Sequence, residues 1–193
     1  MNQHLSEPEL NAGLETIRRS PKDAGTLEMI VIRPRDQERR VLDECEVSGR
    51  LGVHGDLWAN SWTKVPPGGA PNFDIQVTLM NSRCIALLAQ DKSRWPLAGD
   101  QLYVDMDLSA NNLPPGQRLA IGSVILEITA IPHTGCALFV ERFGKEAAVW
   151  VNSPVGKQLH LRGIYARVVQ DGRVKAGDVI RKVAEKLVLN QTP

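Results

Sequence analysis

The sequence lacks the features that mark several classes of protein. Its 193 residues carry a formal net charge of +1, so no overall charge draws the chain to nucleic acid or to an anionic membrane. No apolar run approaches the roughly 20 residues that a transmembrane helix requires. Residues 1–25 are polar and contain no apolar core of a signal peptide. We therefore expect a cytoplasmic protein that has neither nucleic acid nor a membrane as its partner.

Cysteine is scarce, and its spacing matches no common site. Cys45, Cys84 and Cys136 lie too far apart for a zinc or iron–sulfur pattern. An odd number of thiols in a reducing compartment argues against a disulfide framework. Nothing in the sequence resembles a flavin or haem site. Each cysteine is therefore considered as a single thiol.

The sequence does contain a series of short, evenly punctuated strand patterns. Alternating and β-branched runs predict strands over residues 26–34, 39–48, 74–80, 100–108, 117–131 and, in several pieces, 159–183. Helical patterns cover residues 7–20, 82–92, 137–144 and 145–154, where Pro154 is expected to stop the last helix. Asn81 is expected to cap the helix over residues 82–92. Residues 117–131 are expected to form a β-hairpin or a bent strand, with Gly122 at the bend. Strands outnumber helices and no internal repeat occurs. The pattern favours a mainly β fold, a closed β-barrel with a few short helices at its ends.

The predicted organisation has three parts. Residues 1–24 form an N-terminal extension, residues 25–183 form one β-barrel domain, and residues 184–193 form a C-terminal tail. Two loops within the domain, residues 49–56 and 58–74, are rich in glycine or proline. Loops this close together suggest a binding rim. The second loop carries Trp58 and Trp62, which are candidates to line a pocket.

Cys136 occupies the corner between an apolar strand and a short helix, in the stretch "PHTGCALFVERFG". The start of a helix and a nearby His133 imidazolium both favour a thiolate, the form that ligates soft metals and accepts sulfur. The alternative is a small buried residue that fills the corner. We predict that Cys136 is a solvent-accessible thiolate and that Cys84, on the apolar face of a helix, belongs to the core.

Five pieces of the sequence, in this order, resemble the MOSC domain. The pieces are "GVHGD" (52–56), "QVTLMNSR" (76–83), "NNLPPGQRLAIGSVILEITAIPHTGC" (111–136), "WVNSP" (150–154) and "RGIYARVVQDGRVKAGDVI" (162–180). This domain occurs at the C-terminus of molybdenum cofactor sulfurases, in amidoxime-reducing molybdenum proteins and as stand-alone bacterial proteins. The resemblance implies a β-barrel that binds a molybdenum cofactor, a molybdopterin, or handles its sulfur.

The resemblance implies two alternative functions for Cys136. In the amidoxime reducers the matching cysteine is a metal ligand, which implies a small oxidoreductase that reduces N-hydroxylated substrates with electrons from a donor protein. In the sulfurases it is proposed to carry sulfur, which implies a non-catalytic carrier of cofactor or persulfide. The sulfurase's pyridoxal-phosphate domain has no counterpart here, so a cysteine desulfurase-like protein would have to donate the sulfur. A barrel that binds another anionic small molecule is a third possibility.

A pterin cofactor needs cations at its phosphate and amide partners at its ring. Arg142 and Arg167 are available as cations, and Arg83 and Arg162 are expected to form a basic patch beside Cys136. His133 is either a catalytic residue or a solvated loop histidine, and Thr134 either caps the following helix or contacts the ligand. Gly99-Asp100 is interpreted as a turn. The other candidate cofactor-binding residues are Thr78, Asn81, Asn111 and Asn112.

Overall fold

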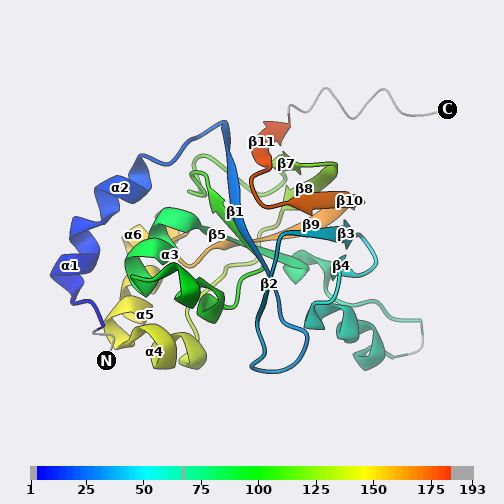
Figure 1. Ribbon diagram of the computed structural model, residues 1–193, viewed down its shortest axis with the longest axis horizontal. Coiled ribbons are helices and arrows are strands. Elements are labelled where there is room, and N and C mark those ends of the chain that lie inside the picture. The colour runs from blue at the N-terminus through cyan, green and yellow to red at the C-terminus, as the bar shows by residue number, and fades with distance from the viewer. Residues whose placement is uncertain (1–3, 67, 184–193) are drawn as a thin grey trace.

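A ring of strands forms the body of the protein. The computed structural model describes residues 4–66 and 68–183 (Figure 1). Its strands are β1 (Ala24–Ile32), β2 (Arg40–Leu42), β3 (Glu44–Ser48), β4 (Gly52–Val53), β5 (Val77–Asn81), β6 (Leu102–Asp105), β7 (Arg118–Ile121), β8 (Val124–Ile128), β9 (Ile164–Gln170), β10 (Gly172–Lys175) and β11 (Val179–Val183). Within the eight-stranded sheet the order is β11-β7-β8-β9-β5-β6-β1-β2, and β11 also pairs with β1. Seven strands thus close a barrel, and β2 lies outside the ring. The mainly β, closed-barrel fold predicted from the sequence is confirmed.

The α-helices lie on one side of the strands, and the 3-10 helix of residues 57–64 lies on the other (Figure 1). The α-helices are α1 (Glu7–Ala12), α2 (Leu14–Arg18), α3 (Ser82–Ala89), α4 (Ala137–Phe143), α5 (Lys145–Asn152) and α6 (Pro154–Gln158). The 3-10 helices are η1 (Leu57–Lys64), η2 (Phe73–Ile75) and η3 (Lys92–Ala98). None of the helices that the structure describes has the length and apolar character needed to span a bilayer.

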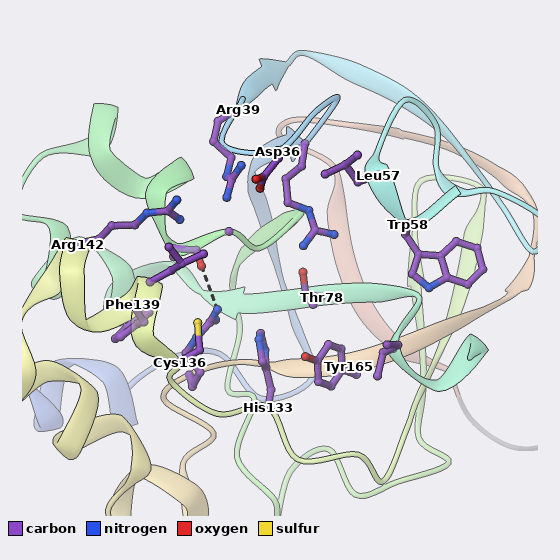
Figure 2. A pocket seen from close by; sticks show the side chains of 16 residues that line it. Asp36, Arg39, Leu57, Trp58, Thr78, His133, Cys136, Phe139, Arg142 and Tyr165 are labelled. Atoms are coloured by element: carbon purple, nitrogen blue, oxygen red, sulfur yellow. Dashed lines mark hydrogen bonds between the residues drawn. The ribbon is translucent and has the colours of Figure 1, made fainter. Parts of the chain in front are cut away.

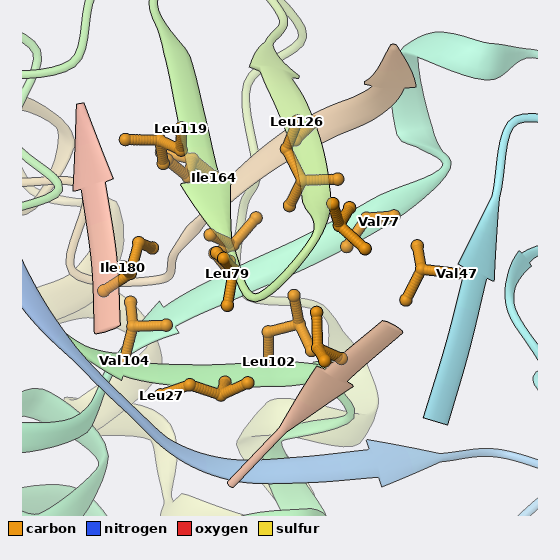
Figure 3. Packing of buried hydrophobic residues seen from close by; sticks show 14 of the residues in the cluster. Leu27, Val47, Val77, Leu79, Leu102, Val104, Leu119, Leu126, Ile164 and Ile180 are labelled. Atoms are coloured by element: carbon orange, nitrogen blue, oxygen red, sulfur yellow. The ribbon is translucent and has the colours of Figure 1, made fainter. Parts of the chain in front are cut away.

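The barrel interior is filled by aliphatic side chains from nearly every strand. Leu79, Val104, Leu119 and Ile180 are fully buried and lie close together inside the ring (Figure 3). On β7 and β8 the buried residues alternate with half-buried ones, as expected of strands with one face on a core. Burying such a side chain stabilises the fold by about 1.5–3 kcal/mol, so this cluster is the main source of stability for the barrel.

A second core lies between the barrel and the helices. Met80 and Tyr103 extend from the outer face of the strands and belong to the same cluster as Phe139 and Phe143 of α4. Leu10 from α1 is also fully buried there. The described part of the predicted N-terminal extension therefore packs against the helical layer. The domain boundary at residue 24 stays a prediction, and the predicted tail, residues 184–193, lies outside the described residues.

Three local predictions need correction. The helix expected over residues 7–20 is divided at Gly13, where a Cβ atom would lie 2.4 Å from the side chain of Leu87. The strand expected over residues 39–48 is two strands, β2 and β3, which belong to different sheets. Pro154 does follow α5, but it is also the first residue of α6. Proline is tolerated there because the first residue of a helix donates no backbone hydrogen bond within the helix. The Ser153 hydroxyl caps α6 by accepting from Gly156 N at 3.1 Å.

Candidate functional site

Cys136 lies at the start of α4, as the sequence predicts, and its side chain is exposed. It is the N-cap residue, and its carbonyl accepts hydrogen bonds from Phe139 N at 2.9 Å and Val140 N at 3.1 Å. No side chain caps this helix, so the expectation that Thr134 caps it is wrong. Thr134 lies two residues too early in the chain, in a loop that is held instead by a bond from Gly135 N to Asn152 Oδ1 at 3.0 Å.

A cavity of about 410 Å³ opens beside Cys136, and we call it the arginine cavity. Its guanidinium groups come from separate parts of the chain: Arg33 follows β1, Arg142 lies in α4 and Arg162 precedes β9. Figure 2 shows Arg39, Arg142, Cys136 and His133 converging on this space. The four arginines are Arg33, Arg39, Arg142 and Arg162, and the only acidic side chain among the described lining residues is Asp36.

Each arginine is held by oxygen atoms of the protein. Arg33 binds the buried Asp56 through two contacts, Nε to Oδ2 at 2.9 Å and Nη2 to Oδ1 at 2.7 Å. Arg142 Nη1 donates to the Leu97 carbonyl at 2.6 Å. Burial, followed by the charges of Arg142 and Arg33, lowers the pKa of Arg39. Because the guanidinium groups repel one another, an anion bound among them would be stabilised.

The floor of the arginine cavity contains a buried ion pair. Arg162 Nη1 lies 2.6 Å from Asp100 Oδ2, and its Nη2 donates to the Ala98 carbonyl at 2.9 Å. Asp100 is fully buried, and burial raises the pKa of its carboxyl against the opposing charge of Arg162. The interpretation of Gly99-Asp100 as a turn is therefore incomplete. Gly99, with φ of 89°, makes the turn, and this turn directs Asp100 into the protein.

His133 lies beside this pair, and its ring centroid is 4.4 Å from that of Tyr165. Its side chain is only 8% exposed, and its Nδ1 is 3.6 Å from Asp100 Oδ1, too far for a hydrogen bond. Burial, followed by the charges of Arg162 and Arg33, lowers the pKa of His133 to about 2. The expected imidazolium at His133 is therefore wrong, since a neutral ring lies here. The positive charge near Cys136 comes from arginines instead.

Several buried polar atoms around the arginine cavity have no hydrogen-bond partner among the described residues. Arg39 Nε and Arg162 Nε are two such donors, and His133 Nδ1 and Asp100 Oδ1 are also unpaired. An unpaired buried donor costs about 1–3 kcal/mol, so a bound acceptor would remove part of this cost. No group of three or more histidine, cysteine or acidic side chains among the described residues could hold a metal ion.

The structure brings together four of the candidate site residues. Thr78, His133, Cys136 and Arg162 line the arginine cavity. The Thr78 hydroxyl donates to Gln101 Oε1 at 2.5 Å, so its proton is already engaged.

The other candidates do not line the arginine cavity, and most have their polar atoms engaged elsewhere. Asn81 caps α3, as predicted, by accepting from Cys84 N at 2.9 Å, and Arg83 binds Asp105 with its Nε 2.7 Å from Oδ1. Asn112 Nδ2 donates to the Asp107 carbonyl at 2.7 Å. Asn111 is exposed. The structure therefore does not place these residues at the arginine cavity, and Asn81, Arg83 and Asn112 serve instead in a cap, an ion pair and a turn.

Sequence reasoning missed Arg33, Arg39, Asp100 and Tyr165. Arg33 is the one charged residue near the end of the strand predicted over residues 26–34, which is the one local signal that it faces the barrel end. Trp58 lines the arginine cavity, as predicted from its position in the loop of residues 58–74. The side chain of Trp62 lies outside the described part of the structure.

The three thiols differ in environment, which leads to a prediction. Cys84 is fully buried, as expected, and burial raises its pKa; burial also raises the pKa of Cys45 to about 11. We therefore expect iodoacetamide at pH 7.5 to modify Cys136 at least tenfold faster than either of the others, by peptide mass spectrometry. His133→Ala should leave that rate nearly unchanged, since the ring carries no charge. Modification of Cys84 or Cys45 as fast as Cys136 would contradict this assignment.

The family model for the MOSC domain matches residues 85–181, a segment that includes His133, Cys136 and Arg162. The chain belongs to the MOSC family. Several solved structures share its fold. One, described only as a hypothetical protein, is 17% identical with a TM-score of 0.58, covering 88% of this chain and 71% of that one. A comparison with curated proteins finds no match.

Two further solved structures with this fold are named bacterial proteins. YuaD from Bacillus subtilis is 18% identical with a TM-score of 0.53, covering 81% of this chain and 94% of that one. YiiM from Escherichia coli is 16% identical with a TM-score of 0.53, covering 82% and 70%. At these identities the likeness shows the fold alone. The MOSC family as a whole is associated with binding of the molybdenum cofactor.

Proposed function

We propose that this MOSC protein binds the molybdenum cofactor in the arginine cavity, with the Cys136 sulfur as a ligand of the metal. The observation that carries the proposal is the convergence of four guanidinium groups and one exposed cysteine on a single cavity of about 410 Å³. Guanidinium groups match phosphate oxygens, and a thiolate suits a soft metal.

The residues that line the arginine cavity fit the molybdenum cofactor. Arg39 Nε and Arg162 Nε are buried donors without an acceptor among the described residues, and a phosphate or a polar ring atom would provide one. When bound, the cofactor supplies a redox-active metal that can take an oxygen atom from a substrate. Arg39 and Arg142 would bind its anionic end, whereas Arg162, fixed by Asp100, would orient it. The neutral ring of His133 would exchange hydrogen bonds without acting as an acid.

The reaction that we propose is reduction of an N-hydroxylated substrate. In this reaction R–NHOH, two electrons and two protons give R–NH₂ and water, so the N–O bond breaks and its oxygen leaves as water. The electrons come from a separate electron-donor protein. The exposure of Cys136 supports this assignment, because a substrate can approach the sulfur ligand from solvent.

The same exposure supports a second candidate function, a sulfur carrier. The Cys136 thiolate would attack the outer sulfur of a persulfide on a cysteine desulfurase-like donor. A new S–S bond forms on Cys136 as the donor thiolate leaves, so the step needs no external oxidant. An exposed thiol beside a basic surface can be reached by a protein donor, whereas a buried thiol cannot.

Cofactor retention tests the proposal. In protein purified from a host that makes the cofactor, we expect Arg39→Gln to lower bound molybdenum at least tenfold, because a charge-assisted hydrogen bond contributes about 1.5–3 kcal/mol. Cys136→Ser should lower it as well, measured as metal per chain by mass spectrometry. Arg83→Gln is the matched control, because Arg83 is an arginine bound to a carboxylate outside the arginine cavity.

Three outcomes distinguish the alternatives. Molybdenum near one per chain, with reduction of a hydroxylamine by a chemical donor that is lost in Cys136→Ser, supports the oxidoreductase. Absence of the metal together with an added sulfur atom on Cys136 supports the carrier. Equal molybdenum content in wild type, Arg39→Gln and Arg83→Gln would show that the arginine cavity does not bind the cofactor.

A further inference from the structure

A second cavity, of about 420 Å³, lies behind the loop that precedes Cys136, and we call it the apolar cavity. Three stretches of chain enclose it: residues 110–115, residues 128–134 from the end of β8 onward, and residues 156–164 from α6 to the start of β9. His133 lines both cavities. The volume falls within the range of about 300–1,000 Å³ that small-ligand sites occupy.

The walls of the apolar cavity are hydrocarbon, and its backbone is fixed. Ile128, Val151 and Ile164 line it and are buried. Gly163, with φ of 102°, can carry no side chain, because a Cβ atom would lie 2.4 Å from the Leu79 carbonyl. The Thr129 hydroxyl donates to the Asp74 carbonyl at 2.6 Å and so is already engaged. The cavity is therefore suited to an apolar body and needs no rearrangement to open.

One charged side chain borders this apolar surface. Lys157 lines the cavity and is exposed, and it forms no ion pair with any described residue. No acidic side chain occurs among the described residues that line the cavity. His160 also lines it, but its Nδ1 donates to the Leu108 carbonyl at 2.7 Å, which holds the ring in place. The uncompensated ammonium group therefore favours a ligand that carries one negative charge.

We propose that the apolar cavity is a second ligand site, which binds a small molecule with an apolar body about the size of two fused rings and one carboxylate. The body packs against Ile128 and Ile164, and the carboxylate pairs with Lys157. The inference is independent of the function proposed for the arginine cavity, because it rests on a different set of side chains apart from His133.

Three probes test the site in the full-length protein by isothermal titration calorimetry. 2-Naphthoate has both required features, 2-naphthalenemethanol lacks the charge, and acetate lacks the apolar body. We expect 2-naphthoate to bind about three- to fivefold more tightly than the alcohol, as an exposed ion pair allows, and acetate to show no binding. Lys157→Ala should remove that preference and leave the affinity for the alcohol unchanged. Lys145→Ala, at an exposed lysine of α5 outside the cavity, is the matched control.

Two further variants separate this site from the arginine cavity. Ala130→Trp places a large ring in the apolar cavity and should abolish binding of both naphthyl probes, whereas Arg39→Ala should change neither. If the Trp variant does not fold, methyl chemical shifts of Ile128 and Ile164 in the wild-type protein replace it and should move on addition of 2-naphthoate. Loss of naphthoate binding in Arg39→Ala, or methyl shifts that stay unchanged, would overturn the inference.

Discussion

Replacement of Arg162 by methionine should lower the free energy of unfolding at pH 7 by about 3–5 kcal/mol, the usual cost of leaving one partner of a buried ion pair alone. Asp100 is fully buried, and its Oδ2 would lose a partner at 2.6 Å. The Ala98 carbonyl would lose its donor at the same time. Urea unfolding followed by circular dichroism measures the loss.

The pH dependence of this variant has a definite sign. Burial already raises the pKa of Asp100, and without Arg162 it rises further, so the folded state binds a proton that the unfolded state has released. The free energy of unfolding of Arg162→Met must then fall as pH rises from the unfolded to the folded pKa of Asp100. The difference in stability from the wild type should therefore shrink toward pH 4. The double variant Arg162→Met with Asp100→Asn should recover much of the loss, because both charges are gone.

Arg83→Met is the matched control for this prediction. Arg83 also binds a carboxylate at 2.7 Å, but both side chains of that pair are more than a quarter exposed. Solvent screening limits such a pair to about 0–1 kcal/mol. If Arg162→Met costs no more than Arg83→Met at pH 7, the Asp100–Arg162 pair does not stabilise the floor of the arginine cavity.

Acidification should destabilise the wild-type protein through His133. Its pKa is about 2 in the folded protein and about 6.5 when unfolded, so between these values the unfolded state binds the extra proton. Stability therefore rises with pH over this window and is lost as pH falls below about 6.5. At 1.36 kcal/mol for each pH unit, His133 should account for about 3 kcal/mol of stability lost between pH 6.5 and pH 4.

The variant His133→Gln tests this prediction. Its unfolding free energy, measured at pH 7, 5.5 and 4, should fall less steeply than that of the wild type, although its stability at pH 7 should be lower. Tyr165→Phe is the control, because it keeps the ring that stacks on His133 and removes only the hydroxyl. Parallel pH profiles for His133→Gln and the wild type would mean that the histidine is accessible to protons in the folded state.

Local features of the fold could be predicted from the sequence because they depend on neighbouring residues. The β7–β8 hairpin turns at Gly122, and Asn81 caps α3, as expected. Cys136 begins α4 because strand and helix patterns meet there. Each of these features needs information from only a few positions along the chain.

The floor of the arginine cavity could not be predicted in the same way. Asp100 and Arg162 are 62 residues apart and meet only because β5 joins β6 in parallel and β9 in antiparallel pairing. A glycine–aspartate pair is common in turns, so its sequence alone does not show a buried carboxylate. Arg83 is a candidate because it ends the MOSC-like segment of residues 76–83. In the folded chain it binds Asp105 instead, a contact that the sequence does not indicate.

The closure of the barrel has a consequence for how the protein is made. β11 alone joins β1 to β7, through pairs such as Ala24 with Arg181 and Ile121 with Ile180. A nascent chain therefore leaves the ribosome with two unpaired strand edges until almost all of the described domain has emerged. Such edges are where chains associate wrongly, and pairing between distant strands forms slowly. The described domain therefore most needs protection from aggregation in the period before this five-residue strand has emerged.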